Sequence, residues 1–273
     1  MILSRGVRLA SAPGTLRVSV LLYVAAIGLA EACAAFVSVW GGLLLHAGLI
    51  LALLNHYVLA TTGAVETSER DEPPHPFLDV LLVLSLAPQL RVLSLSMAVE
   101  SVPDRYAYAI VGAPLLLAAV LAARFVTPPG LARHLRPGSW WQAPLALSGL
   151  PLGSIGYLIA GPERSIVSGG SARIFAAAAV IVFLAGLLEE LLFRGLIQGA
   201  LERLFGWGGP LLGSALFGFV YLGVGAASYW VFIAVLGVVF ASVVARTGTV
   251  LGVGIAHGLL NVSVLIVWPS VLD

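Results

Sequence analysis

The sequence has no lysine, little charge of either sign and a single cysteine. All 14 basic residues are arginine, 10% of the residues are charged, and the formal net charge is +1. A soluble domain carries about 25% charged residues, so this composition excludes an ordinary water-soluble enzyme. The small net charge argues against a nucleic-acid partner. Cys33 lies inside an apolar run and has no second cysteine to pair with, so we expect it to pack there.

Long apolar runs take the place of the missing charge. Hydrophobic residues make up 60% of the 273 positions, and the mean hydropathy is +1.04. A helix that spans a bilayer needs about 20 apolar residues, so the sequence predicts an all-α, polytopic membrane bundle of about eight or nine transmembrane helices. We expect the spans near residues 18–40, 42–62, 77–99, 106–126, 140–160, 172–200, 209–225, 228–246 and 250–268.

Arginine placement orients these predicted spans. With the N-terminus in the cytoplasm, most loop arginines lie on or near the cytoplasmic side, as the positive-inside bias favours. These arginines are Arg5, Arg8, Arg17, Arg124, Arg133, Arg136, Arg203 and Arg246. The first span has no small-residue cleavage site and is interpreted as retained. We therefore expect an integral membrane protein of a bacterial inner membrane, surrounded by membrane lipids.

The span at 172–200 holds the densest group of charges, Glu189-Glu190-Leu-Leu-Phe-Arg194. An ionisable group inside a bilayer is costly, which makes each one a candidate functional residue. Residues four apart share a helix face, so Glu190 and Arg194 can form an ion pair. Glu189 lies about 100° around the helix and is left for another partner. An ion-paired helix end that only joins two spans is the open alternative.

The last span carries a second polar pair, His257 and Asn261, also four apart on one face. By helical rise, His257 lies about 12 Å and Glu189 about 8–12 Å from the cytoplasmic ends of their spans, so the two can meet. Four glycines would let helices approach closely around that point: Gly248, Gly252, Gly254 and Gly258. A packing histidine, or a pair that only joins helices by hydrogen bonds, is the alternative to a catalytic role.

Two further charges lie deep in the N-terminal spans. Glu31 and Arg91 both lie about 20 Å from the inner side by helical rise, and we expect a structural ion pair, with a functional role as the alternative. His46 and His56 point to different helix faces and are not expected to form a ligand pair.

The residues from 189 to 261 resemble the CPBP family, the intramembrane proteases that include type II CAAX prenyl endopeptidases and bacteriocin-processing enzymes. Its first motif, E-E-x-x-x-R, matches Glu189, Glu190 and Arg194, and its H-x-x-x-N motif matches His257 and Asn261. The third motif also includes Arg246-Thr-Gly-Thr-Val-Leu251. The resemblance covers roughly residues 140–268. Residues 1–135 are interpreted as an added N-terminal transmembrane segment and a candidate contact surface for a membrane-protein partner.

The resemblance implies a role for each matched residue. Glu189 would be the general base that activates a water, with Glu190 and Arg194 as its support. His257 and Asn261 would stabilise the oxyanion of the tetrahedral intermediate. We expect no metal and no cofactor: a catalytic zinc site usually needs three protein ligands, one of the available carboxylates is engaged with arginine, and there is no H-E-x-x-H.

The second family motif, F-x-x-x-H, departs from the pattern, because this chain has Phe217-Gly-Phe-Val-Tyr221. Tyr221 would have to replace the histidine. A tyrosine can donate a hydrogen bond, but it titrates near about pH 10 and is a poor base at neutral pH. Losing one acid–base group typically costs about 10²–10⁴-fold in rate, so both a slow enzyme and an inactive relative are consistent with Tyr221.

Two functions therefore follow from the resemblance. The leading hypothesis is an intramembrane endopeptidase that uses a glutamate-activated water to hydrolyse a peptide bond of a membrane-associated protein or peptide. The alternative is a catalytically inactive CPBP homologue that acts as a membrane scaffold, adaptor or ligand-binding protein. A secondary transporter is less favoured, because no duplicated half with interrupted helices stands out.

Overall fold

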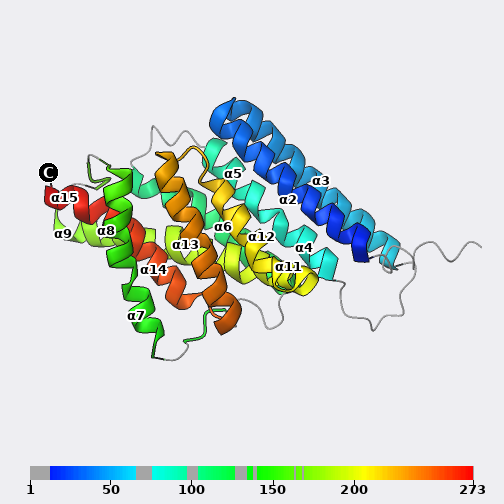
Figure 1. The fold of residues 1–273 in the computed structure, drawn as a ribbon. Helices are drawn as coiled ribbons and strands as arrows, with labels where there is room; N and C mark the ends of the chain where they lie inside the picture. The colour runs from blue at the N-terminus through cyan, green and yellow to red at the C-terminus, as the bar shows by residue number, and fades with distance from the viewer. Residues whose placement is uncertain are drawn as a thin grey trace, which may run out of the picture.

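The computed structural model describes residues 13–65, 76–96, 104–126, 134–137, 140–162, 164–167 and 169–272. Within these residues all regular structure is helical (Figure 1). The predicted fold class is confirmed: the chain is a polytopic helical bundle. The large apolar side chains that remain exposed lie along the outer helices, as a lipid-facing surface requires.

The N-terminal half begins with two long antiparallel helices that lie along one side of the bundle (Figure 1). They are α2 (Pro13–Phe36) and α3 (Val39–Val65), followed by α4 (Pro76–Leu84), α5 (Leu86–Ser96) and α6 (Asp104–Val126). The break between α4 and α5 has a local cause. The ring of Pro88 clashes with the carbonyl four residues earlier, at Leu84, and α4 ends there.

The C-terminal half is built from helices that contain three π-helical segments. It starts with α7 (Gln142–Leu147) and α8 (Gly149–Ala160). One long continuous segment follows, made of α9 (Ser171–Val180), η3 (Ile181–Leu187), α10 (Leu188–Glu190), η4 (Leu191–Gln198) and α11 (Gly199–Phe205). The remaining elements are α12 (Gly208–Val220), α13 (Ala227–Thr247), α14 (Leu251–Val262), η5 (Ser263–Val267) and α15 (Trp268–Leu272).

The described helices agree with the predicted spans in position. Seven segments are long and apolar enough to cross a membrane, and two shorter apolar helices, Ala109–Arg124 and Gly208–Val220, fall at the other two predicted places. The segment predicted at 172–200 extends to Phe205 and ends before Gly206, whose φ is 56°; near this end Arg203 pairs with Asp79 of α4 at 2.8 Å. The segment predicted at 209–225 ends at Val220, before a turn in which Gly223 and Gly225 adopt positive φ.

The close helix approach that the glycines predict occurs between α14 and η3. A Cβ atom at Gly186 would lie 2.5 Å from the backbone N of Gly258, and one at Gly258 would lie 2.5 Å from the Cα of Val182. Gly254 faces Leu187 in the same contact. This seam brings the helix of the two glutamates against the helix of His257. Gly248 acts elsewhere, since its φ of 71° ends α13 in the left-handed conformation.

The N-terminal and C-terminal halves share one cluster of buried apolar side chains. Leu81 and Leu84 of α4, Leu196 of η4 and Phe217 of α12 all belong to it. The division into segments 1–135 and 140–268 stays a prediction, and the packing shows that the N-terminal helices support the helices that carry the candidate site.

Candidate active site

Glu189 and Glu190 lie in α10, three residues of α-helix between the π-helical segments η3 and η4. A π turn inserts a residue into the α-helical pattern and re-aims the side chains beside it, and such turns are frequent at functional sites. Within α10 the two adjacent carboxylates point about 100° apart and therefore reach different partners.

Glu190 and Arg194 form the ion pair that their spacing predicts, with 3.0 Å between Glu190 Oε1 and Arg194 Nη1. Neither side chain is exposed. The guanidinium also donates to the Gly237 carbonyl from α13 at 3.3 Å and lies 3.9 Å above the ring centroid of Phe217. A buried charge requires such pairing, because an unpaired one would carry the full cost of leaving water.

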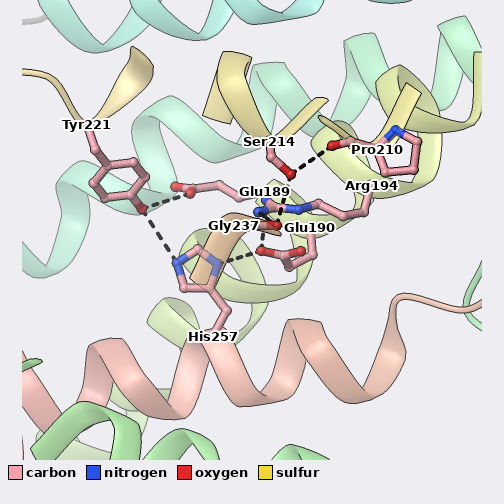
Figure 2. A network of polar contacts seen from close by, with 8 residues as sticks. All are labelled: Glu189, Glu190, Arg194, Pro210, Ser214, Tyr221, Gly237 and His257. Carbon is pink, nitrogen blue, oxygen red and sulfur yellow. Dashed lines mark hydrogen bonds and ion pairs between the residues drawn. The ribbon is translucent and has the colours of Figure 1, made fainter. Parts of the chain in front are cut away.

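His257 reaches the same carboxylate from α14. Its Nδ1 lies 3.0 Å from Glu190 Oε1 (Figure 2). A carboxylate paired with arginine can only accept, so Nδ1 carries the proton and donates it. When His257 is neutral, its Nε2 is therefore an acceptor.

Tyr221 links His257 to Glu189. Its hydroxyl lies 3.2 Å from Glu189 Oε2 and 3.5 Å from His257 Nε2, so the phenol stands between the two side chains (Figure 2). Tyr221 follows directly on the last residue of α12, and its backbone N donates to the Gly218 carbonyl. The residue that departs from the family motif thus occupies the centre of the polar chain.

Exposure divides the site residues into a buried group and a half-buried group. Glu190 is 0% exposed, Arg194 1% and His257 3%, whereas Glu189 and Tyr221 are half-buried. The half-buried residues are the glutamate predicted to act as base and the tyrosine next to it. The buried Glu190–Arg194 ion pair holds His257 through its Nδ1, and Nε2 is on the side of Tyr221.

Asn261 is the predicted site residue that the network does not include. It is half-buried on α14, one turn after His257, and among the described residues its side chain hydrogen-bonds to none of the other five. Its predicted role requires a bound substrate. In the described part of the chain, no three side chains of His, Cys, Asp or Glu form a group that could hold a metal ion.

Phe217 contacts three site residues, which the sequence reasoning did not foresee. Besides the guanidinium of Arg194, its ring lies 5.7 Å from the His257 ring in an edge-on arrangement and 5.0 Å from the Tyr221 ring. The F-x-x-x-H spacing holds the only sequence signal, since residues 217 and 221 share a helix face. Ser214, one turn earlier, shares the Gly237 carbonyl with Arg194.

The N-terminal spans hold a separate buried ionic cluster. The predicted pair is present, with 2.8 Å between Arg91 Nε and Glu31 Oε2. His46 Nε2 lies 3.5 Å from the other oxygen of Glu31, a contact that the sequence reasoning missed. His56 lies apart from it and contacts the Tyr23 hydroxyl at 3.1 Å.

Comparison with known families supports the interpretation of the motifs. Residues 171–263 match the family model described as Rce1-like, type II CAAX prenyl endopeptidase. The match confirms the resemblance to the CPBP family. The Rce1-like segment runs from the start of α9 to the start of η5 and contains all six predicted site residues. Searches of curated proteins and of solved structures find no match.

Proposed function

We propose that the chain is an intramembrane endopeptidase that hydrolyses a peptide bond of a membrane-associated protein or peptide. The observation that carries the proposal is the contact chain from Glu189 through Tyr221 to His257, inside a segment that matches a family of proteases. Glu189 Oε1 makes no hydrogen bond to any described residue, so this oxygen is available to a water.

The proposed chemistry begins at that water. Glu189 removes a proton as the water oxygen attacks the peptide carbonyl, and the electron pair of the C=O bond moves onto the carbonyl oxygen. His257 and Asn261 are the proposed donors to this oxyanion. Each well-placed donor of this kind contributes about 10²–10³-fold in rate.

We propose a substrate class on the basis of the same family match. A type II CAAX prenyl endopeptidase acts near the C-terminus of a prenylated chain, and a lipid anchor would bring such a substrate to an intramembrane site. A quenched fluorogenic peptide that ends in a farnesylated CAAX sequence is therefore the first probe, presented in mixed micelles with the purified protein. The same peptide without its lipid tests whether the anchor matters.

Glu189→Gln is the decisive variant, because it keeps the size of the side chain and removes its basicity. We expect a loss of about 10²–10⁴-fold in cleavage rate. Glu202→Gln is the matched control, since Glu202 lies on α11 of the same continuous helix and contacts Gln198 outside the site. Cleavage that survives Glu189→Gln would contradict the mechanism. A parent protein that cleaves neither peptide would favour the inactive homologue.

We further propose that the N-terminus lies in the cytoplasm of a bacterium with this protein in its inner membrane. The Arg203–Asp79 ion pair joins the end of α11 to the start of α4, so both ends lie on one side of the membrane, and the positive-inside bias of the arginines favours the cytoplasm for that side. Alkaline phosphatase fused after residue 273 should then be active, because the enzyme matures only outside the cytoplasm. The same fusion after residue 205 should be inactive.

A further inference from the structure

We propose that Tyr221 passes protons between Glu189 and His257, so that a proton taken from the attacking water reaches His257 Nε2, the nitrogen beside the phenol. This inference rests on the proposed function and adds a role for the residue that departs from the family motif. It is carried by the order of the contacts, Glu189 Oε2 to Tyr221 Oη at 3.2 Å and Tyr221 Oη to His257 Nε2 at 3.5 Å.

The hydroxyl of Tyr221 lies between two acceptors and has only one proton to donate. With Nδ1–H directed at Glu190, a neutral His257 offers only a lone pair at Nε2. An ionised Glu189 also only accepts. Tyr221 has one hydroxyl proton for these two acceptors, so one of its two contacts lacks a proton. The shorter distance, to Glu189, is the one that the hydroxyl proton fits.

With one added proton, each of the two contacts of Tyr221 becomes a hydrogen bond. Two arrangements of the protons achieve this. In the first, Tyr221 donates to ionised Glu189 while protonated His257 donates to the phenol oxygen. In the second, protonated Glu189 donates to the phenol oxygen while Tyr221 donates to neutral His257. The two arrangements differ by one proton shift at each end of the hydroxyl. The phenol gives one proton as it receives another and stays neutral throughout.

This exchange supplies the Nε2 proton that His257 needs in order to donate to the oxyanion. A neutral His257 has no proton at Nε2 and cannot donate to an oxyanion. When Glu189 takes a proton from the attacking water, the shift through Tyr221 leaves Glu189 ionised again and puts a proton on Nε2. The protonated imidazole lies against ionised Glu190, which stabilises its charge. As the C–N bond breaks, this proton passes to the leaving amine, so water adds across the bond and every group returns to its starting state.

The surroundings hold the phenol in this position. The Phe217 ring packs against both Tyr221 and His257, and Trp230 Nε1 donates to the Gly218 carbonyl at 2.8 Å, close to the end of α12. Among the described residues, His257 contacts the titratable groups of Glu190 from α10 and Tyr221 from the end of α12. Arg194 forms an ion pair with Glu190. Tyr221 thus provides a continuous path for a proton from Glu189 to His257.

The first experiment measures coupling without any substrate. In protein labelled with ¹⁵N-histidine and held in detergent micelles, the midpoint of the His257 titration is recorded by NMR for the parent and for Glu189→Gln. We expect a clear shift of this midpoint. In the Tyr221→Phe background, Glu189→Gln should produce less than half of that shift. An equal shift in both backgrounds would overturn the relay, whatever the activity of the protein.

The second experiment uses cleavage of the farnesylated peptide. We expect Tyr221→Phe to lower kcat by about 10²-fold or more with little change in KM. Tyr221→His should recover most of the rate, since an imidazole can also take and give a proton. The parent rate in mixtures of H₂O and D₂O should curve with deuterium content, as for two protons in flight, and the residual rate of Tyr221→Phe should vary linearly.

Two controls separate the possible failures. Tyr157→Phe removes a phenol hydroxyl from α8, where Tyr157 stacks on Trp268 away from the site, and should leave kcat unchanged. Full activity of Tyr221→Phe in a protein that loses activity on Glu189→Gln would overturn the relay and keep the protease. Coupling through Tyr221 in a protein that cleaves nothing would keep the relay and reject the proposed function.

Discussion

His257 Nδ1 and Arg194 Nη1 each lie 3.0 Å from one oxygen, Oε1 of Glu190. The second glutamate of the motif therefore holds the histidine of α14. Its neighbour Glu189 contacts a different residue, Tyr221. The arrangement resembles a carboxylate that fixes the tautomer of a catalytic imidazole, a role known to be worth several orders of magnitude in rate. It makes Glu190 a positioning residue.

Glu190→Gln should therefore damage both catalysis and stability. The amide can no longer fix the His257 tautomer, and we expect kcat to fall by about 10²–10⁴-fold. It also leaves the buried guanidinium of Arg194 without a counter-charge, which costs about 3–5 kcal/mol. Thermal unfolding in detergent and peptide cleavage check the two effects separately. A double variant with Arg194→Met should recover more than half of the lost stability, and additive losses would contradict the pairing.

The glycine seam between α14 and η3 should tolerate no side chain. In Gly258→Ala the new methyl group would meet the backbone of Val182, so the two helices must separate. We expect lower thermal stability and reduced cleavage, because Glu190 and His257 lie on opposite sides of this seam. Gly199→Ala is the control: it is a helical glycine of the same continuous segment with nothing within 4 Å of the added Cβ, and it should be neutral or stabilising. Equal effects of the two changes would contradict the seam.

Most of the architecture was predictable, because each span carries its own apolar run and the turns are marked by proline and glycine. The helix ends were less predictable than the spans. α11 continues to Phe205 and ends before Gly206, and Arg203 near that end pairs with Asp79 of α4, a partner that no local pattern contains. The short α12 ends early because of the turn at Gly223 and Gly225, which the apolar composition of 209–225 conceals.

Spacing also predicted the intrahelical contact of the site, but not the contacts between helices. Glu190 and Arg194 lie four residues apart, so their pairing follows from the helix itself. The contact of Glu190 with His257 joins residues 67 positions apart. The partner of each carboxylate depends on which helices pack against α10, and no sequence rule contains that packing. The same is true of His46, whose neighbour Glu31 comes from another helix.

The cluster of Glu31, Arg91 and His46 should contribute to stability and leave the chemistry of the site alone. Arg91→Met leaves Glu31 buried without its partner, and we expect a loss of about 3–5 kcal/mol in unfolding free energy. Adding Glu31→Gln should recover much of it. The rate per folded molecule should stay within about twofold of the parent in both variants. A fall in kcat at unchanged stability would instead give this cluster a functional role.

Asn261→Ala should separate an oxyanion donor from a residue that only joins helices. Among the described residues Asn261 makes no hydrogen bond to the rest of the site, so its loss should change unfolding free energy by less than about 0.5 kcal/mol. If its amide donates to the oxyanion, kcat should fall by about 10²–10³-fold while KM stays constant, because the bond forms only in the transition state. Asn55→Ala, at an exposed position on α3, is the matched control for both measurements. Loss of stability together with an unchanged rate per folded molecule would mean that Asn261 joins helices and takes no part in hydrolysis.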